Sequence, residues 1–196
     1  MNFSPLMVDD YQKLKKYFEN QTYQLSTYSL FSIIVWSNRK IRTYFAIEND
    51  TLIIFNEPAH EPGGRHLILP MSLKETPSPE YLYKLAKEIG LVKYCFVPET
   101  YLERSDRDNI GLYFIVTEQP EYEDYIYLTE DLDQLKGNKY ARQRNLIHQF
   151  HKVYLSKGRV GIETIASDNV QDCLDFLLKW CIQHNCDLDG NESLAC

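Results

Sequence analysis

The amino-acid sequence predicts an α+β fold with a mixed, largely antiparallel sheet. Two strand-like runs, 41–47 and 51–55, flank the polar triplet 48–50, which is typical of a β-hairpin. Helical patterns occur before and after this hairpin without the regular βαβ alternation of a doubly wound sheet. With 196 residues the chain can bury a sizeable core. These observations favour a mixture of hairpins and helices packed around one sheet.

The first element predicted is a helix that begins at Ser4 and Pro5. Serine supplies a capping hydroxyl, and proline suits the first helical position. We expect this helix to end near Asn20. Its apolar face would carry Leu14, Tyr17 and Phe18, with Lys13, Lys15 and Lys16 mostly elsewhere.

The middle of the chain alternates between strand and helix signals. The apolar run 30–36 fits either type, whereas 66–69 predicts a strand that Pro70 stops. Ser78 and Pro79 begin a helix that extends through Ile89, and Gly90 follows in the position where a left-handed residue is usual. Further predictions are a buried strand at 93–97, a short helix at 98–103 and a strand at 111–117.

A junction is predicted at 119–124, where the chain is acidic and contains proline. A short strand, 124–128, follows it, and Thr129 caps a turn of helix. Gly137 and Asn138 then interrupt the helix. Asn138 is expected to cap a longer helix that continues to about Leu155 and is closed by Gly158.

The last predicted elements are a strand at 160–164 and a final helix. Asp168 and Gln171 fit a capping box for that helix. One of its faces would carry Val170, Cys173, Leu174, Leu177 and Cys181. A strand and one helix cannot bury their own apolar faces, so we expect something further to complete this second unit.

The composition excludes several classes of protein. The net charge of −7 argues against general attraction to nucleic acid or anionic lipid. No run approaches the roughly 20 apolar residues that span a bilayer, and no secretory signal is visible. Five cysteines in no regular framework indicate reduced thiols. We therefore expect a cytoplasmic protein.

One basic cluster stands out in this acidic chain, and we take it as the candidate binding site. It surrounds the predicted helix start and consists of Lys136, Lys139, Arg142, Arg144 and Asn145. Free backbone N–H groups at a helix start also attract anions. The functional interpretation is a site for phosphate or carboxylate groups of a nucleotide, a tRNA backbone or a lipid headgroup. The alternative is a solvated charged face paired with Glu130, Asp131 and Asp133.

Other residue groups carry weaker signals. The turn 62–65 resembles a phosphate cradle but fits neither glycine fingerprint, so a plain turn is favoured. Cys181, His184 and Cys186 lie close in sequence, but no second pair has zinc spacing, and no metal is predicted. The carboxylates Glu121, Glu123 and Asp124 match an exposed linker better than an acid–base pair. No catalytic residue is assigned.

The run from Asp124 to Leu132, the segment 135–140, the pair Arg144–Asn145 and Phe150 resemble a known signature. The signature is that of the phosphatidylglycerol lysyltransferase C-terminal domain family. Trp36 and Trp180 also stand where that family tends to have tryptophan. The likeness extends over nearly the whole chain and is specific over about 124–150.

The resemblance implies two GNAT-like modules in tandem (the fold of N-acetyltransferases), as in Fem-type aminoacyltransferases. The first module would span 1–123, and 124–196 would hold a connecting helix and an incomplete second module. It implies transfer of an aminoacyl or acyl group, for which acyl-CoA and aminoacyl-tRNA are the candidate donors. No cofactor is identified from the sequence. A further C-terminal part, or an oligomeric partner, would complete the second module.

Three functional hypotheses follow. The first is aminoacyl or acyl transfer to an amine or hydroxyl acceptor, chemistry that depends mainly on positioning and carbonyl polarisation. The second is a non-catalytic module that binds tRNA or another anion through the segment 136–152. The third is a purely structural half whose partner completes the sheet.

Overall fold

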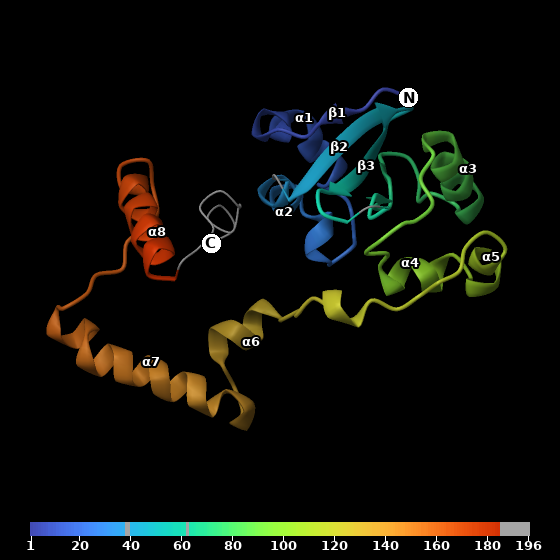
Figure 1. Cartoon of the computed structure of the whole chain (residues 1–196). Coiled ribbons are helices and arrows are strands. Elements are labelled where there is room, and N and C mark those ends of the chain that lie inside the picture. The colour runs from blue at the N-terminus through green and yellow to red at the C-terminus, as the bar shows by residue number, and fades with distance from the viewer. Residues whose placement is uncertain (38–39, 62, 185–196) are drawn as a thin grey trace. The chain divides into compact units, whose positions relative to one another are not determined.

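A computed structural model describes residues 1–37, 40–61 and 63–184 (Figure 1). The contacts between residues divide the chain into two units. One comprises Met1–Asp124 together with residues from Leu178 onward, and the other is Tyr125–Leu177. The elements form an α+β architecture with a mostly antiparallel sheet, as the sequence predicts.

The sheet lies in the first unit and is built around one hairpin. Strands β2 (Ile41–Glu48) and β3 (Thr51–Pro58) pair antiparallel over their full length, which confirms the predicted hairpin (Figure 1). Asn49 and Asp50 connect them with φ of 50° and 59°. Two left-handed residues in a two-residue loop match the twist of the flanking strands, so this turn fixes the register.

Three short strands extend the sheet on both sides. They are β1 (Ser4–Pro5), β4 (His66–Leu67) and β5 (Met71–Ser72), and the order is β1-β2-β3-β4 with β5 also paired to β3. All of these pairings are antiparallel. The predicted strand at 66–69 is thus present but shorter.

The predicted start of the first helix is wrong. Ser4 and Pro5 pair with Phe45 and Tyr44 as strand β1, so the segment begins extended. Helical turns begin four residues later, where the Asp10 carboxylate accepts a hydrogen bond from the Met7 N–H at 3.0 Å. This side-chain cap provides a helix start that the serine–proline signal did not indicate.

The helical turns that follow are η1 (Val8–Asp10), α1 (Tyr11–Leu14) and η2 (Lys15–Tyr17). Their predicted apolar face is confirmed, since Leu14 and Tyr17 are buried. The next turn, η3 (Ser26–Tyr28), leads into α2 (Leu30–Trp36). The ambiguous apolar run is therefore a helix.

Helix α3 (Pro79–Ile89) matches its prediction at both ends. The Ser78 hydroxyl accepts a hydrogen bond from the Tyr81 N–H at 3.2 Å, and Gly90 ends the helix with φ of 76°. Helices α4 (Glu99–Arg104) and α5 (Arg107–Gly111) follow. The first of these confirms the short helix predicted at 98–103.

Two predicted strands of the first unit are not formed. Within 93–97, Tyr94 makes one isolated parallel bridge with Leu67. Residues 112–117 contain no strand, and Ile115 is 95% exposed. The Leu67 N–H donates to the Lys93 carbonyl, and the Leu67 carbonyl accepts from the Cys95 N–H, so 93–97 contacts β4 through a single bridge. Both segments have strand-like composition, but among the described residues neither forms the run of ladder hydrogen bonds that defines a strand.

Hydrophobic side chains cover both faces of β3. Leu52 and Ile54 belong to the larger core cluster, which includes Leu14 and Leu30. Ile53 points to the opposite face because side chains alternate along a strand. There it packs with the smaller group of Leu67, Leu85 and Ala86. Helix α3 thus contributes to a core that is distinct from that of the N-terminal helices.

A chain of hydrogen bonds connects polar side chains across β2, β3 and β4. The Thr43 hydroxyl donates to Oδ1 of Asn56 at 2.8 Å, which leaves the Asn56 amide nitrogen to donate to Nε2 of His66 at 3.3 Å. Nδ1 of His66 in turn lies 2.8 Å from the Gly64 carbonyl oxygen. His66 is buried, and this burial lowers the pKa of its imidazole. The ring is therefore neutral, with its proton on Nδ1.

The second unit is helical. It contains α6 (Thr129–Gln134), η5 (Asn138–Tyr140), α7 (Ala141–Val153) and η6 (Leu155–Lys157), and helix α8 (Val170–His184) begins in it. The strands predicted at 124–128 and 160–164 are not formed. Among the residues of this unit, Tyr140 is the one buried side chain.

The break between the two central helices is confirmed, although its cap differs from the prediction. Gly137, with φ of 87°, occupies the capping position, and Asn138 makes no capping hydrogen bond. Gly158 closes the segment with φ of 61°. The apolar side chains of Ile147, Phe150 and Tyr154 in this segment are 48%, 42% and 44% exposed.

The predicted capping box of the last helix is wrong. Helix α8 begins at Val170, and the Asn169 side chain bonds the Ala166 N–H and the Thr164 carbonyl. Gln171 donates forward to Asp175 instead of reaching back to a cap. Of the predicted apolar face, Cys181 is buried, whereas Val170 and Leu174 are about half exposed.

Candidate functional site

The candidate site lies where the chain turns from α6 into α7. Leu135 ends α6 with φ of 47°, and Gly137 adopts φ of 87°, so the backbone reverses within a few residues. Left-handed backbone is open to glycine and costs other residues free energy, which makes Gly137 the natural pivot of this turn. The predicted site residues lie on both sides of the pivot, and all of them are exposed.

Arg144 holds this turn in place. Its Nη1 atom donates to the carbonyl oxygens of Leu135 and of Gly137, the latter at 2.8 Å. Carbonyls at the end of a helix have no partner within the helix, so a guanidinium that bonds them stabilises the turn. Arg144 therefore serves first as a structural support of the site.

Lys139 has an internal acidic partner. Its amine lies 3.3 Å from Oδ2 of Asp131 and 4.7 Å from the centre of the Tyr140 ring. The hydrogen bond to Asp131 raises the pKa of the Lys139 amine. Both charged side chains are well exposed, and exposed pairs of this kind contribute little to stability. An incoming anion would therefore compete with Asp131 at small cost.

Lys136 and Arg142 differ from these two cations. Within the part of the chain that the structure describes, neither side chain makes a hydrogen bond or ion pair, and Asn145 makes none either. Glu130, a predicted internal partner, accepts a hydrogen bond from Gln134 instead. Of the three acidic residues named as internal partners, Asp131 pairs with the cluster. Lys136 and Arg142 thus remain available for a ligand.

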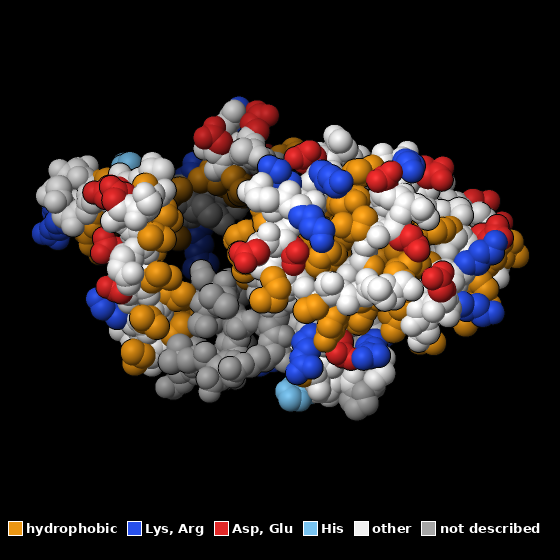
Figure 2. Space-filling model, turned by 90° about the horizontal axis from the view of Figure 1, so that it is seen from above, with side chains coloured by type: hydrophobic (Ala, Val, Ile, Leu, Met, Phe, Trp, Pro, Cys, Tyr) orange, Lys and Arg blue, Asp and Glu red, His pale blue; other side chains and the backbone are white. Residues whose placement is uncertain are grey.

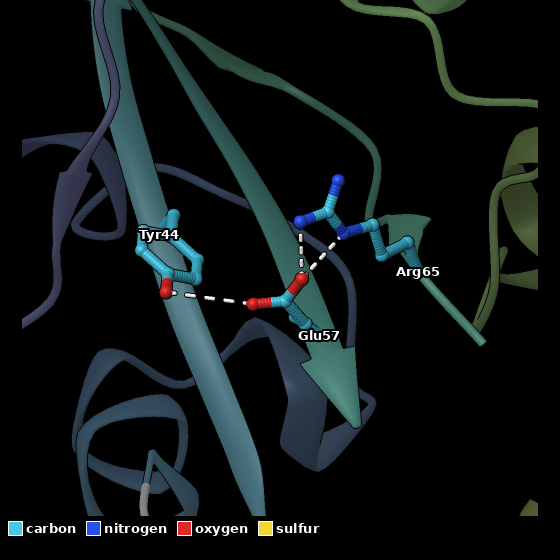
Figure 3. A network of polar contacts seen from close by, with 3 residues as sticks. All are labelled: Tyr44, Glu57 and Arg65. Carbon is cyan, nitrogen blue, oxygen red and sulfur yellow. Dashed lines mark hydrogen bonds and ion pairs between the residues drawn. The ribbon is translucent and has the colours of Figure 1, made fainter. Parts of the chain in front are cut away.

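The turn 62–65 does not present a free basic group. Figure 3 shows that Arg65 reaches the Glu57 carboxylate, with Nε 2.5 Å from Oε1, while the Tyr44 hydroxyl approaches the other oxygen at 3.5 Å. The Gly64 N–H donates to the Glu61 carbonyl at 2.8 Å. Pro62 lies outside the described residues. These bonds support the interpretation of a plain turn.

The remaining weak candidates are not brought together. Cys186 lies outside the described residues, and the described part of the chain contains no group of three potential metal ligands. Asp124 accepts hydrogen bonds from Ser26, at 2.6 Å from the backbone nitrogen and 3.2 Å from the hydroxyl. Asp124 therefore ties the end of the first unit to η3.

A groove in the first unit was not predicted. It has a volume of about 330 Å³ and is lined by residues of three separate segments, 16–23, 70–77 and Arg104. No local sequence motif joins these segments, so its residues could be found only from the fold.

On the face shown in Figure 2, acidic and basic side chains are interspersed with hydrophobic ones. Among the described residues, no helix is both long enough and apolar enough to cross a membrane.

Comparison with known families identifies a matching family. The model of a family described as "Phosphatidylglycerol lysyltransferase, C-terminal" matches residues 35–196. The match covers most of the chain, including the hairpin, α7 and the basic cluster. Searches of curated proteins and of solved structures found no match.

Proposed function

The chain belongs to the phosphatidylglycerol lysyltransferase C-terminal family, and from this premise we propose that it takes part in aminoacyl or acyl transfer. In this proposal the donor is an activated carrier with phosphate groups, such as aminoacyl-tRNA or acyl-CoA. The acceptor is an amine or hydroxyl compound, of which phosphatidylglycerol is the first to test. The observation that carries the proposal is the family match over residues 35–196.

The basic cluster is proposed to hold the donor's phosphate groups. Lys136 and Arg142 are exposed and unpaired among the described residues. They flank a turn that Arg144 supports and that precedes the 13-residue helix α7. The positive end of a helix dipole adds to their attraction for an anion. Lys139 would join them once a phosphate replaces Asp131 as the partner of its amine.

The chemistry would follow the GNAT-like pattern, in which the protein orients donor and acceptor and polarises the reacting carbonyl. Such a reaction needs no nucleophilic side chain. The α+β architecture with its antiparallel sheet is compatible with a GNAT-like first module. In this proposal residues 1–123 form that module and 124–196 belong to the second.

A second candidate function is binding of tRNA or another polyanion without catalysis. One observation favours it. In the described structure the contacts of the cluster are one carboxylate, two backbone carbonyls and an aromatic ring. The cluster itself consists of lysine, arginine and asparagine side chains, which can bind an anion. It contains no histidine, the side chain that exchanges protons near neutral pH.

A binding experiment tests the role of the cluster. Lysyl-tRNA is titrated against the wild type and the Lys136→Ala/Arg142→Ala variant at several salt concentrations. We expect the variant to bind at least about tenfold more weakly, because each charge-assisted contact contributes about 1.5–3 kcal/mol. The slope of log affinity against log salt should fall by about 2.

The matched control is Lys157→Ala/Arg159→Ala, which removes the same charge from exposed positions beyond the segment 136–152. If this control weakens binding as much as the first variant does, general electrostatics and not the cluster is responsible. Absence of binding to the wild type at low salt would refute the site.

A transfer assay separates the two functions. Radiolabelled lysine on tRNA is incubated with the protein and with vesicles that contain phosphatidylglycerol, and the lipid is then extracted. Labelled lipid would support transfer, and its loss in the Lys136→Ala/Arg142→Ala variant would connect transfer to the cluster. Salt-sensitive binding with no labelled acceptor would favour the binding module.

A further inference from the structure

The groove in the first unit combines an apolar floor with a basic rim. Its floor includes Tyr17, Met71 and Pro77, all of which are buried. Tyr23 also lines the groove, and its ring packs edge-on against the Tyr28 ring, with ring centres 4.9 Å apart. The groove therefore combines apolar contacts with a polar lining, as small-molecule sites do.

The residues that line the groove include three cations, Lys16, Lys74 and Arg104. Glu75 is the one carboxylate among these lining residues. The three cations come from η2, from the loop after β5 and from the end of α4. In a chain with a net charge of −7, this local excess of positive charge runs against the overall balance. The groove therefore attracts anions.

The present contacts of these cations are weak. The Lys16 amine lies 5.1 Å from the centre of the Tyr17 ring, and Arg104 donates to the Thr22 hydroxyl over 3.4 Å. The Lys74 amine pairs with Asp50 at 3.1 Å, and both of these side chains are more than half exposed. Because exposed pairs contribute little free energy, an anion can recruit these groups at small cost.

The Tyr23 hydroxyl adds a neutral donor. Burial raises the pKa of this hydroxyl, so it keeps its proton at neutral pH. Within the described residues the hydroxyl makes no hydrogen bond. Tyr23 can therefore donate to a ligand oxygen while its ring contacts the body of the ligand.

We infer that this groove binds a small organic phosphate, whose ring or apolar body rests on the Tyr17–Met71–Pro77 floor and whose phosphate is held by Lys16 and Arg104. Guanidinium and ammonium groups together suit a phosphate with several oxygens. A volume of about 330 Å³ is that of a small-molecule site, at the low end of the usual range. The inference does not depend on the proposed function, because all of these residues lie within Met1–Asp124.

The test is calorimetric titration of the full chain with ADP, which has both a ring body and phosphates. Adenosine supplies the body alone, and pyrophosphate supplies the anion alone. We expect saturable ADP binding that weakens with salt, and weaker binding of each fragment. The Lys16→Ala/Arg104→Ala variant should lose at least about tenfold in ADP affinity, because both removed groups make charge-assisted contacts.

Matched variants make the result decisive. Lys15→Ala/Lys87→Ala removes the same charge from exposed positions outside the groove and should bind ADP like the wild type. Tyr23→Phe should weaken binding with little effect on folding, since it removes one hydroxyl. The mutated cations are exposed, so thermal melts should show folded proteins.

Several outcomes would overturn the inference. These are absence of saturable ADP binding at millimolar concentration, or equal affinity in the groove variant and its charge-matched control. Loss of ADP binding in Lys136→Ala/Arg142→Ala would place ADP at the helix start and also contradict it. Failure of lysyl-tRNA binding with ADP binding intact would instead refute the basic cluster as a tRNA site and would leave the groove inference standing.

Discussion

Nε2 of His66 lies 3.3 Å from the side-chain amide nitrogen of Asn56, within the sheet. Because Asn56 accepts from Thr43 through its oxygen, its nitrogen donates, and the histidine must be the acceptor. The fold is thus built around the neutral form of this imidazole. Protonation would place two donors against each other in a buried position and would cost free energy.

The first prediction is that stability depends on this neutral histidine. The folded pKa of His66 lies below the unfolded value of about 6.5, so the unfolded state binds more protons in the interval between the two. The contribution is therefore fully present above about pH 6.5 and declines as the pH falls below it. Urea unfolding of the wild type between pH 5 and 8, conditions that bracket about 6.5, measures this dependence.

The His66→Gln variant should lose that part of the pH dependence, since glutamine does not titrate. His60→Gln is the control, because His60 is exposed and should leave the dependence unchanged. An identical pH profile in wild type and His66→Gln would show that another group is responsible.

The second prediction concerns the end of α3. Gly90 adopts φ of 76° with open space around it, so alanine would meet no neighbour but would be strained by the backbone. Gly90→Ala should lower the free energy of unfolding by about 1–2 kcal/mol. Gly111 also has open space but no positive φ, and Gly111→Ala should be neutral or slightly stabilising. Equal effects of the two substitutions in denaturant unfolding would contradict this explanation.

The third prediction separates the buried core from the exposed helix face. Ile54 is fully buried, and Ile54→Ala should cost about 2–5 kcal/mol. Phe150 is 42% exposed, and Phe150→Ala should cost well below the 3–5 kcal/mol of a buried phenylalanine. Chemical unfolding of the two variants measures the difference. A larger loss for Phe150→Ala would mean that this helix face is covered in solution.

The fourth prediction concerns Arg144. Arg144→Ala should increase amide hydrogen exchange at residues 135–140, because the turn loses two hydrogen bonds. Arg142→Ala, which removes the same charge without a contact, should leave exchange unchanged. Similar exchange in both variants would mean that Arg144 does not support the turn.

The elements that were predicted correctly carry their signals locally. The hairpin has two strand-like runs around a turn, and α3 has a serine cap and a terminal glycine, so each is defined by neighbouring residues. The strands predicted at 111–117, 124–128 and 160–164 show the limit of this approach. Their composition suits a strand, but a strand also needs a partner for its backbone, and composition does not report one.

The same limit applies to the sites. The basic cluster was found because its residues are close in sequence. The separate roles of its residues could not be predicted. The roles of Lys139 and Arg144 depend on the positions of Asp131 and of two carbonyls in three dimensions. The groove was missed because Lys16, Lys74 and Arg104 are brought together by the fold alone.

Pro5, which was expected to begin a helix, has a different consequence as a residue of β1. The neighbouring Leu6 N–H donates inward to the Thr43 carbonyl, so position 5 of the alternating strand faces away from β2. Proline offers no N–H there. A further strand that approached this border of the sheet would find one donor missing, which disfavours growth of the sheet by addition of other chains. Pro5 thus protects the border against self-association.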